Sequence, residues 1–86
     1  MIINNKVRIY TYTFSTENYI YNNLFIGNTE FNALDDGISN FWDNGIIGNY
    51  WDDYTGVDEN DDGIGDTPYY IPGLAVSVDN YPIYNL

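Results

Sequence analysis

Residues 20–28 read IYNNLFIGN, and this stretch carries the pattern that decides the fold. Within it Ile20, Asn23, Phe25 and Asn28 follow the spacing I-x-x-N-x-F-x-x-N. Inward apolar residues that alternate with corner Asn are typical of a parallel β-helix, because Asn tolerates left-handed backbone and its amide can bond along a stack of equivalent corners. The alternative is that these Asn residues occupy ordinary turns, and the spacing alone leaves both interpretations open.

The rest of the chain favours strands over helices. Residues 7–14 alternate between two usable faces, with the larger side chains at Arg8, Tyr10, Tyr12 and Phe14 on one of them, which is a strand pattern. Good helix formers are scarce, and no long window carries an apolar repeat of 3.6 residues. Beyond residue 27 the apolar runs are short and are separated by Gly, Asn and Asp. We therefore expect an all-β, coil-rich chain.

Size and charge narrow the classes of partner. The chain has 86 residues, which is enough for one small domain, and its 2 basic and 13 acidic residues give a net charge of -11. Both basic residues, Lys6 and Arg8, lie near the start. Nucleic-acid binding needs Lys or Arg to displace counterions from phosphates, so we expect no nucleic-acid partner. No stretch approaches the roughly 20 apolar residues of a spanning helix, so we expect no membrane insertion.

Composition also limits the chemistry. The chain has no Cys and no His, which excludes a thiol nucleophile, an imidazole base, a zinc site and a disulfide framework. Any bound metal would be a hard cation held by oxygen atoms. With 44% hydrophobic and 19% aromatic residues the chain can bury a core, but a domain this short needs a further staple, either a metal or a partner chain.

Residues 58–66 read DENDDGIGD, the pattern D-x-N-x-D-G-x-x-D, which suggests a calcium loop. Calcium takes six to eight oxygen ligands, and a loop can supply them when alternate residues converge around a Gly bend. The expected ligands in the loop are Asp58, Asn60, Asp62, the carbonyl of Ile64, and Asp66. Asp53 and Asp79 are candidate ligands from outside it. The alternative interpretation is a solvated acidic turn.

Catalysis by a pair of carboxylates is a weaker hypothesis. Such pairs serve glycoside hydrolysis, but no apolar pocket is evident that would raise the pKa of one acid, and a chain this small has little room for a cleft. We therefore expect no enzyme. The Tyr and Trp residues are more typical of core and cap packing than of a sugar platform.

Three segments of the second half resemble a known unit. They are NALDDGISNFWDNG (32–45), GNYWDDYTGVDENDDGIGDTPYYIPG (48–73) and VDNYPIYNL (78–86), and they resemble the C-terminal unit of NosD-like proteins. These are right-handed parallel β-helix proteins of the pectate-lyase-like class, abundant among archaeal surface and periplasmic proteins. Residues 18–30 resemble a preceding rung, meaning one turn of such a helix.

The resemblance implies one domain, residues 1–86, with a fold in two parts. Residues 1–31 would form one to two rungs of a right-handed parallel β-helix, and residues 32–86 a coil-rich, calcium-bound closing unit. The side chains that would pack across the last rung and close the end are Trp42, Tyr50, Trp51, Tyr54, Tyr81 and Pro82. The family's copper-related role is not expected here, because the chain lacks His, Cys and a Met cluster.

These observations together predict a non-enzymatic, calcium-binding structural and self-assembly module of an extracellular or cell-surface β-helix protein. Ca²⁺ would act as a staple that bridges repelling carboxylates. The exposed first rung, residues 7–14, would pair with another copy to give a homo-oligomer. We favour an excerpt of a longer secreted protein. The alternative function is a carbohydrate-binding module that uses surface Tyr and Trp.

Overall fold

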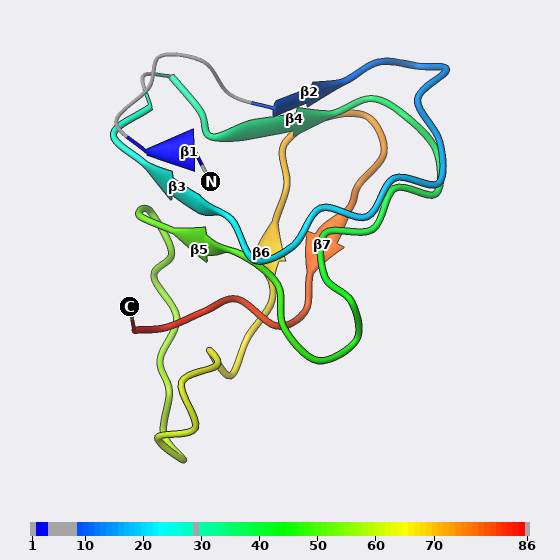
Figure 1. Cartoon of the computed structure of the whole chain (residues 1–86). Coiled ribbons are helices and arrows are strands. Elements are labelled where there is room, and N and C mark those ends of the chain that lie inside the picture. The colour runs from blue at the N-terminus through cyan, green and yellow to red at the C-terminus, as the bar shows by residue number, and fades with distance from the viewer. Residues whose placement is uncertain (1, 4–8, 29, 86) are drawn as a thin grey trace.

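The computed structural model describes residues 2–3, 9–28 and 30–85, and within them every regular element is a short strand. The strands are β1 (Ile2–Ile3), β2 (Ile9–Thr11), β3 (Leu24–Ile26), β4 (Ala33–Asp35), β5 (Tyr50–Trp51), β6 (Tyr69–Tyr70) and β7 (Val78–Asp79). Long connections of irregular chain join them (Figure 1). The expected all-β class is confirmed.

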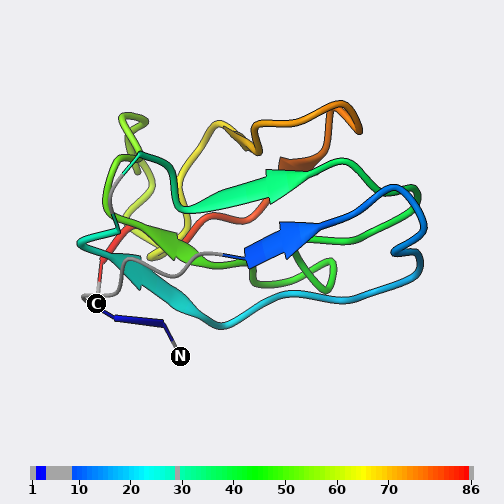
Figure 2. The ribbon, with the colours of Figure 1, turned by 90° about the horizontal axis from the view of Figure 1, so that it is seen from above.

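Successive turns of the chain lie side by side in parallel. One sheet has the strand order β1-β3-β5 and a second pairs β2 with β4. Phe25 is in register with Trp51, and Ile9 with Ala33, so paired residues are 26 and 24 positions apart. In both views β2 and β4 run together in the same direction (Figures 1 and 2). The chain therefore returns alongside itself at a nearly constant interval.

Asn side chains bond between equivalent corners of adjacent turns. The Oδ1 atom of Asn49 accepts hydrogen bonds from the backbone N–H of Asn23 at 3.1 Å and from its side-chain amide at 3.2 Å. Asn40 accepts the same two bonds from Asn18, at 3.1 and 2.9 Å. The predicted amide stack is confirmed at Asn23. These side-chain hydrogen bonds hold adjacent turns in register, although the strands between them are short.

The other residues of the I-x-x-N-x-F-x-x-N pattern differ in how well they match the predicted roles. Phe25 is fully buried, as an inward residue should be. The left-handed backbone lies at Asn22, with φ of 61°, one residue before the stacked Asn23. Asn28 donates through its side-chain amide to Asn32, four residues later, at 3.0 Å. The spacing therefore located the corner but not its left-handed residue.

The alternation predicted for residues 7–14 holds over residues 9–12 and ends at Thr13, which is exposed like Tyr12 and Phe14. Tyr10, Tyr12 and Phe14 are exposed, whereas Thr11 is buried and Ile9 is half-buried. The strand itself ends at Thr11, because a turn follows in which the N–H of Ser15 donates to the carbonyl of Tyr12. Val7 and Arg8 lie outside the described residues.

Aromatic rings form the centre of the core. Trp51 stacks on Phe25 with ring centroids 4.4 Å apart and on Tyr69 at 4.2 Å, with interplanar angles of 5° and 6°. Trp42 packs against Trp51 at 5.9 Å in a tilted arrangement. Such pairs are worth about 0.5–1.5 kcal/mol each beyond the area they bury. The packing of both Trp side chains across the core, implied by the family resemblance, is confirmed.

The C-terminal segment covers the outer edge of β4. The N–H of Asp35 donates to the carbonyl of Pro72 at 2.8 Å, and the N–H of Ala75 donates to the carbonyl of Asp35 at 3.0 Å. Gly73, with φ of 127°, permits this approach because a Cβ there would collide with the backbone of Asp35. In Figure 2 the yellow-to-orange segment lies on the side of β4 opposite to β2.

The last residues cover the neighbouring edge, just before β5. The N–H of Gly48 donates to the carbonyl of Tyr81 at 2.8 Å, and the N–H of Ile83 donates to the carbonyl of Asn49 at 2.9 Å. Beyond them, Ile64 pairs with Ile83 in an antiparallel bridge. Both edges on this side of the molecule, which we call the closing end, are therefore hydrogen-bonded by residues 72–83.

Removing the buried amide of Asn49 should cost more than removing an exposed one. Asn49 is fully buried, and its Nδ2 also donates to the carbonyls of Ile20 and Trp42. We expect Asn49→Ala to lower the free energy of unfolding by about 2–4 kcal/mol, because several buried groups lose their partner. Urea denaturation measures this. The matched control, Asn60→Ala at an exposed position, should change stability by less than about 0.5 kcal/mol; equal effects would contradict the amide stack.

Candidate functional site

The buried carboxylate of Asp79 joins residues 72–83, which we call the closing segment, to the core. Asp79 has no exposed surface, and its Oδ2 accepts hydrogen bonds from the indole N–H of Trp51 at 2.8 Å and the backbone N–H of Asn49 at 2.7 Å. Its Oδ1 accepts from the N–H of Tyr81 at 2.9 Å. A Cβ on Gly48 would collide with this carboxylate, so glycine is required there. Burial raises the pKa of Asp79, and the hydrogen bonds oppose that effect.

Asp35 holds the other Trp in the same way. It is fully buried and accepts five hydrogen bonds from the described residues. The donors are Trp42 Nε1 and Ser77 Oγ to Oδ2, and Thr11 Oγ1, Gly37 N and Asn40 Nδ2 to Oδ1, at 2.6 to 3.3 Å. Burial alone would raise the pKa of Asp35, but these bonds favour the ionised form and hold the pKa at about 2.

The predicted loop, residues 58–66, folds as a hydrogen-bonded turn. Asp58 accepts from the N–H groups of Asp62 and Gly63, at 3.2 and 2.8 Å. Asp62 accepts in turn from the N–H of Ile64 at 2.9 Å. These carboxylates are therefore engaged by the loop's own backbone.

The remaining predicted ligands are dispersed. Asp66 accepts from the N–H of Glu59 at 2.8 Å, and Asn60 donates to Asp62 at 3.3 Å. Asp79 is held in the core, and Asp53 lies in a groove described next. Among the described residues no three His, Cys, Asp or Glu side chains are grouped so that they could hold a metal ion.

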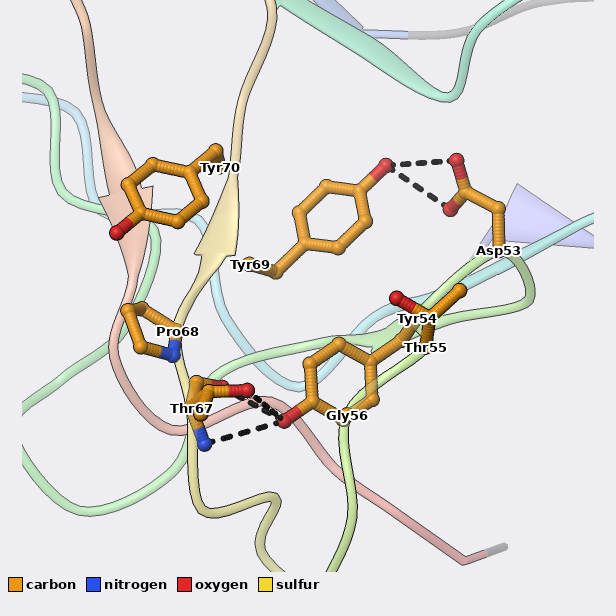
Figure 3. A pocket seen from close by; sticks show the side chains of 8 residues that line it. All are labelled: Asp53, Tyr54, Thr55, Gly56, Thr67, Pro68, Tyr69 and Tyr70. Atoms are coloured by element: carbon orange, nitrogen blue, oxygen red, sulfur yellow. Dashed lines mark hydrogen bonds between the residues drawn. The ribbon is translucent and has the colours of Figure 1, made fainter.

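A groove of about 510 Å³ opens beside Asp53, between residues 53–56 and residues 67–70 (Figure 3). The hydroxyl of Tyr69 donates to both oxygens of Asp53, at 2.9 and 3.1 Å. Burial and this carboxylate raise the pKa of Tyr69, so the phenol stays protonated at neutral pH. The hydroxyl of Tyr54 donates to the carbonyl of Thr67 at 2.6 Å. The groove thus combines fixed aromatic rings with one acidic side chain.

A second hollow of about 260 Å³ shares Asp53 with the groove. It is also lined by Asp52 and Glu30, so it is acidic. The side-chain amide of Asn32 donates to Asp52 at 2.9 Å and to Asp53 at 3.1 Å. Asp53 therefore stands at the junction of an aromatic and an acidic surface.

The sugar-stacking role predicted for surface Trp does not suit this structure. Trp42 and Trp51 are 0% and 1% exposed. Only Tyr side chains are accessible among the residues proposed for that role. Carbohydrate binding stays a prediction.

Sequence reasoning missed the function of the two buried acids and of Tyr69. Asp79 was expected to be a metal ligand, yet it accepts the indole N–H of Trp51, 28 positions away. Asp35 was not expected to hold a Trp side chain, and its donor Ser77 lies 42 positions away. No local spacing relates residues so far apart. One available signal was the presence of two Trp, since a buried indole N–H needs an acceptor.

The fold and these contacts define an all-β unit of parallel, stacked turns, and comparison with known proteins identifies its family. The family described as "Periplasmic copper-binding protein (NosD)" matches residues 1–56, and the chain belongs to this family. The match confirms the NosD-like resemblance. Residues 57–86, which include the loop at 58–66, lie beyond the matched segment, so the loop motif is not supported by it. No solved structure matches the chain.

Two curated relatives share the name "Probable ABC transporter binding protein NosD". The protein of Pseudomonas aeruginosa is 42% identical over 55 residues, and that of Stutzerimonas stutzeri is 40% identical over 55 residues. Each match covers 64% of this chain but only 13% of the relative. The chain thus resembles a small part of these proteins, and the expectation of an archaeal source gains no support from these two bacterial relatives.

The prediction of calcium as the cofactor is wrong. The family is described by copper, and the described residues contain no grouping of acids that could hold a metal. The physical reason is that the loop carboxylates accept backbone N–H groups, while Asp53 and Asp79 are engaged elsewhere. The assignment of the seven individual residues as metal ligands is tested by none of these findings and stays a prediction.

Copper does not fit this chain either. Copper sites are built from imidazole, thiolate and thioether ligands, and the sequence has no His, no Cys and one Met. The buried acids that could offer oxygen are each saturated by hydrogen bonds to Trp and to backbone N–H groups. The family's copper chemistry therefore finds no matching donor set in this chain.

The expected location is confirmed. The family is described as periplasmic, which agrees with a protein that works outside the cytoplasm. The described part of the chain offers no helical segment with the length and hydrophobicity needed to cross a bilayer.

The two buried acids should respond differently to amidation. An Asn side chain at position 35 would present its NH₂ group to two or three donors, whereas at position 79 it could turn that group toward the single donor Tyr81. We expect Asp35→Asn to lower the free energy of unfolding by about 2–3 kcal/mol at pH 6, and Asp79→Asn by less. Urea denaturation measures both.

The pH dependence gives the same test a second readout. The folded-state pKa of Asp35, about 2, lies below its ordinary value of 3.8, so its ionised form stabilises the protein above pH 3.8. This contribution is lost as the pH falls from 3.8 toward 2, and Asp35→Asn should remove that part of the acid sensitivity. For Asp79, whose pKa is raised, protonation on acidification should not weaken the fold. An unchanged acid profile in Asp35→Asn would contradict the assignment.

Proposed function

We propose that this chain is a non-enzymatic structural unit that closes one end of a right-handed parallel β-helix and self-assembles through the other end. The observation that carries the proposal is the asymmetry of the two ends. Parallel pairs recur at nearly constant separation, and residues 72–83 then bond to the outermost edges at the closing end. A β-helix needs such a cover, because exposed strand edges pair with other chains.

The opposite end is formed by the outer edges of β1 and β2, the edge strands of the two parallel sheets in the described residues. In β2 the N–H of Ile9 donates to Asn32 at 3.3 Å, and the carbonyl of Thr11 accepts from Asp36 at 2.8 Å. Because alternate residues of a parallel strand bond to opposite neighbours, the N–H and carbonyl of Tyr10 point away from β4. We call this side of β1 and β2 the open end.

The partner we propose for the open end is a second copy of the chain. At the closing end residues 72–83 already bond to the edge, so a head-to-tail stack finds no free edge there. The described residues of β1, β2 and the turn after β2, up to residue 16, include no acidic side chain, so repulsion between copies is weak at the open end. Contact between two identical open ends gives a closed twofold dimer rather than a fibre.

A lack of catalytic activity is part of the proposal. The two buried carboxylates, Asp35 and Asp79, have donors on both oxygens. Their arrangement supports a role in holding the Trp side chains and the closing segment in place. This is the arrangement expected of a structural unit.

The edge of β2 can be tested at a single residue. Tyr10→Pro removes the outward N–H without touching the bonds of β2 to β4, and edge strands tolerate Pro. We expect it to leave a folded monomer, whereas the wild-type chain forms dimers at high concentration. Light-scattering mass at several concentrations measures this.

The matched control is Tyr10→Ala. Both substitutions remove the hydroxyl contact to Asp36 and the stack on Tyr12, but Ala keeps the N–H. Tyr10→Ala should therefore still dimerise. A wild-type chain that is monomeric at all concentrations, or equal loss of dimer in both variants, would overturn assembly through this edge.

A further inference from the structure

We propose that the groove between residues 53–56 and 67–70 binds an organic cation, an ammonium or guanidinium group carried on an apolar stem. The groove lies at the closing end, so this inference is independent of assembly through β2. The two acids that the core uses, Asp35 and Asp79, do not line it. Figure 3 shows Tyr69 pointing toward Asp53, with the ring of Tyr54 beside it.

The walls of the groove are held rigid before any ligand arrives. Tyr69 stacks on the buried Trp51 at 4.2 Å, and its hydroxyl is fixed by Asp53. The ring of Tyr54 lies so close to Gly56 and Gly65 that a Cβ on either would collide with it. Its hydroxyl is anchored on residue 67. Rigid rings lower the entropy cost of binding.

The charge of the groove selects a cation. The carboxylate of Asp53 accepts a hydrogen bond from the hydroxyl of Tyr69, and the adjoining hollow adds the acidic side chain of Asp52. Residues 9–86 contain no Lys, Arg or His, and Asp53 is the one charged residue among the described residues that line the groove. A net charge of -11 raises the local concentration of cations and repels anionic ligands.

The combination of rings and carboxylate points to an organic rather than a simple inorganic cation. Ammonium and guanidinium groups are attracted to the faces of aromatic rings, and their stems bury against apolar surface. A carboxylate adds a charge-assisted hydrogen bond with defined direction. Tyr54 and Tyr69 supply the first contact and Asp53 the second. The source is either a basic side chain of a polypeptide or a free amine.

The direct test compares the binding of a charged probe with that of an uncharged analogue of similar shape. N-acetyl-arginine amide and N-acetyl-citrulline amide have nearly the same shape and differ in charge. Amide chemical shifts of residues 53–56 and 67–70 are followed by NMR at low salt. We expect the arginine probe to bind these residues at least about fivefold more tightly than the citrulline probe. Equal binding of the two probes, or none, would overturn the proposal.

A pair of charge-matched variants locates the site. Asp53→Asn and Asp61→Asn remove the same charge, but Asp61 is exposed in the loop outside the groove. We expect Asp53→Asn to weaken the arginine probe by about fivefold or more and Asp61→Asn by less than twofold. Equal losses would mean general attraction to an acidic chain, which contradicts a site.

A second pair keeps the test decisive if Asp53→Asn disturbs Tyr69. Thr55→Lys places an ammonium group in the groove, and Thr13→Lys adds the same charge at an exposed turn far along the chain. Thr55→Lys should abolish binding of the probe, whereas Thr13→Lys should leave it within twofold. If both variants lower binding equally, the proposal fails.

Two further ligands identify the source of the cation, and a neutral sugar tests the main alternative ligand. Agmatine represents a free amine, and an acetylated Gly-Ser-Arg-Ser-Gly peptide represents a polypeptide. Tighter binding of either one supports the proposal and names the source. A neutral xylohexaose that shifts the same residues, while the arginine probe shifts none, would replace the cation by a sugar.

Discussion

The stack of Phe25, Trp51 and Tyr69 is the interaction on which the rest of the structure depends. The strands are two or three residues long, so backbone ladders alone hold few residues in register. The three rings connect β3, β5 and β6, and β6 pairs with β7 of the closing segment, so the stack links the parallel turns to that segment. Asp79 fixes the orientation of the Trp51 indole by accepting a hydrogen bond from its N–H group. In this way the small all-β unit has one continuous aromatic core that reaches from the parallel turns to β6.

Burying a carboxylate under each Trp has a physical cost and a structural result. An ionised group taken out of water is stable only when its oxygens find donors, and Asp35 and Asp79 find them from segments far apart in sequence. Each carboxylate therefore holds several segments of the chain together through its hydrogen bonds. Because Ser77 donates to Asp35, and Asp79 accepts the indole N–H of Trp51, the closing segment is tied to the core at two places.

The sequence predicted those features that depend on local spacing. The I-x-x-N pattern located Asn23 as a stacked corner and Phe25 as an inward residue, and alternation placed Tyr10 on an exposed face. Family resemblance located Trp42 and Trp51 across the core. The predictions at Asn23, Phe25 and Tyr10 succeed because neighbours along the chain determine them, whereas the Trp positions came from the resemblance alone.

Features that depend on distant segments were not predictable in this way. The calcium interpretation treated the loop acids as convergent, but their oxygens turn to nearby backbone N–H groups. The groove needs Asp53 and Tyr69, 16 positions apart, to meet across the closing end. Only the return path of the chain brings such residues together, and no periodicity encodes that path.

Native-state hydrogen exchange tests the central claim, that residues 72–83 close the stack, most directly. The N–H groups of Asp35 and Gly48 bond to the closing segment, whereas that of Asp52 bonds between turns to the carbonyl of Phe25. If the segment is an integral part of the fold, all three amides exchange only through global unfolding and show equal protection. Exchange of the Asp35 and Gly48 amides that is orders of magnitude faster than that of Asp52 would contradict the account.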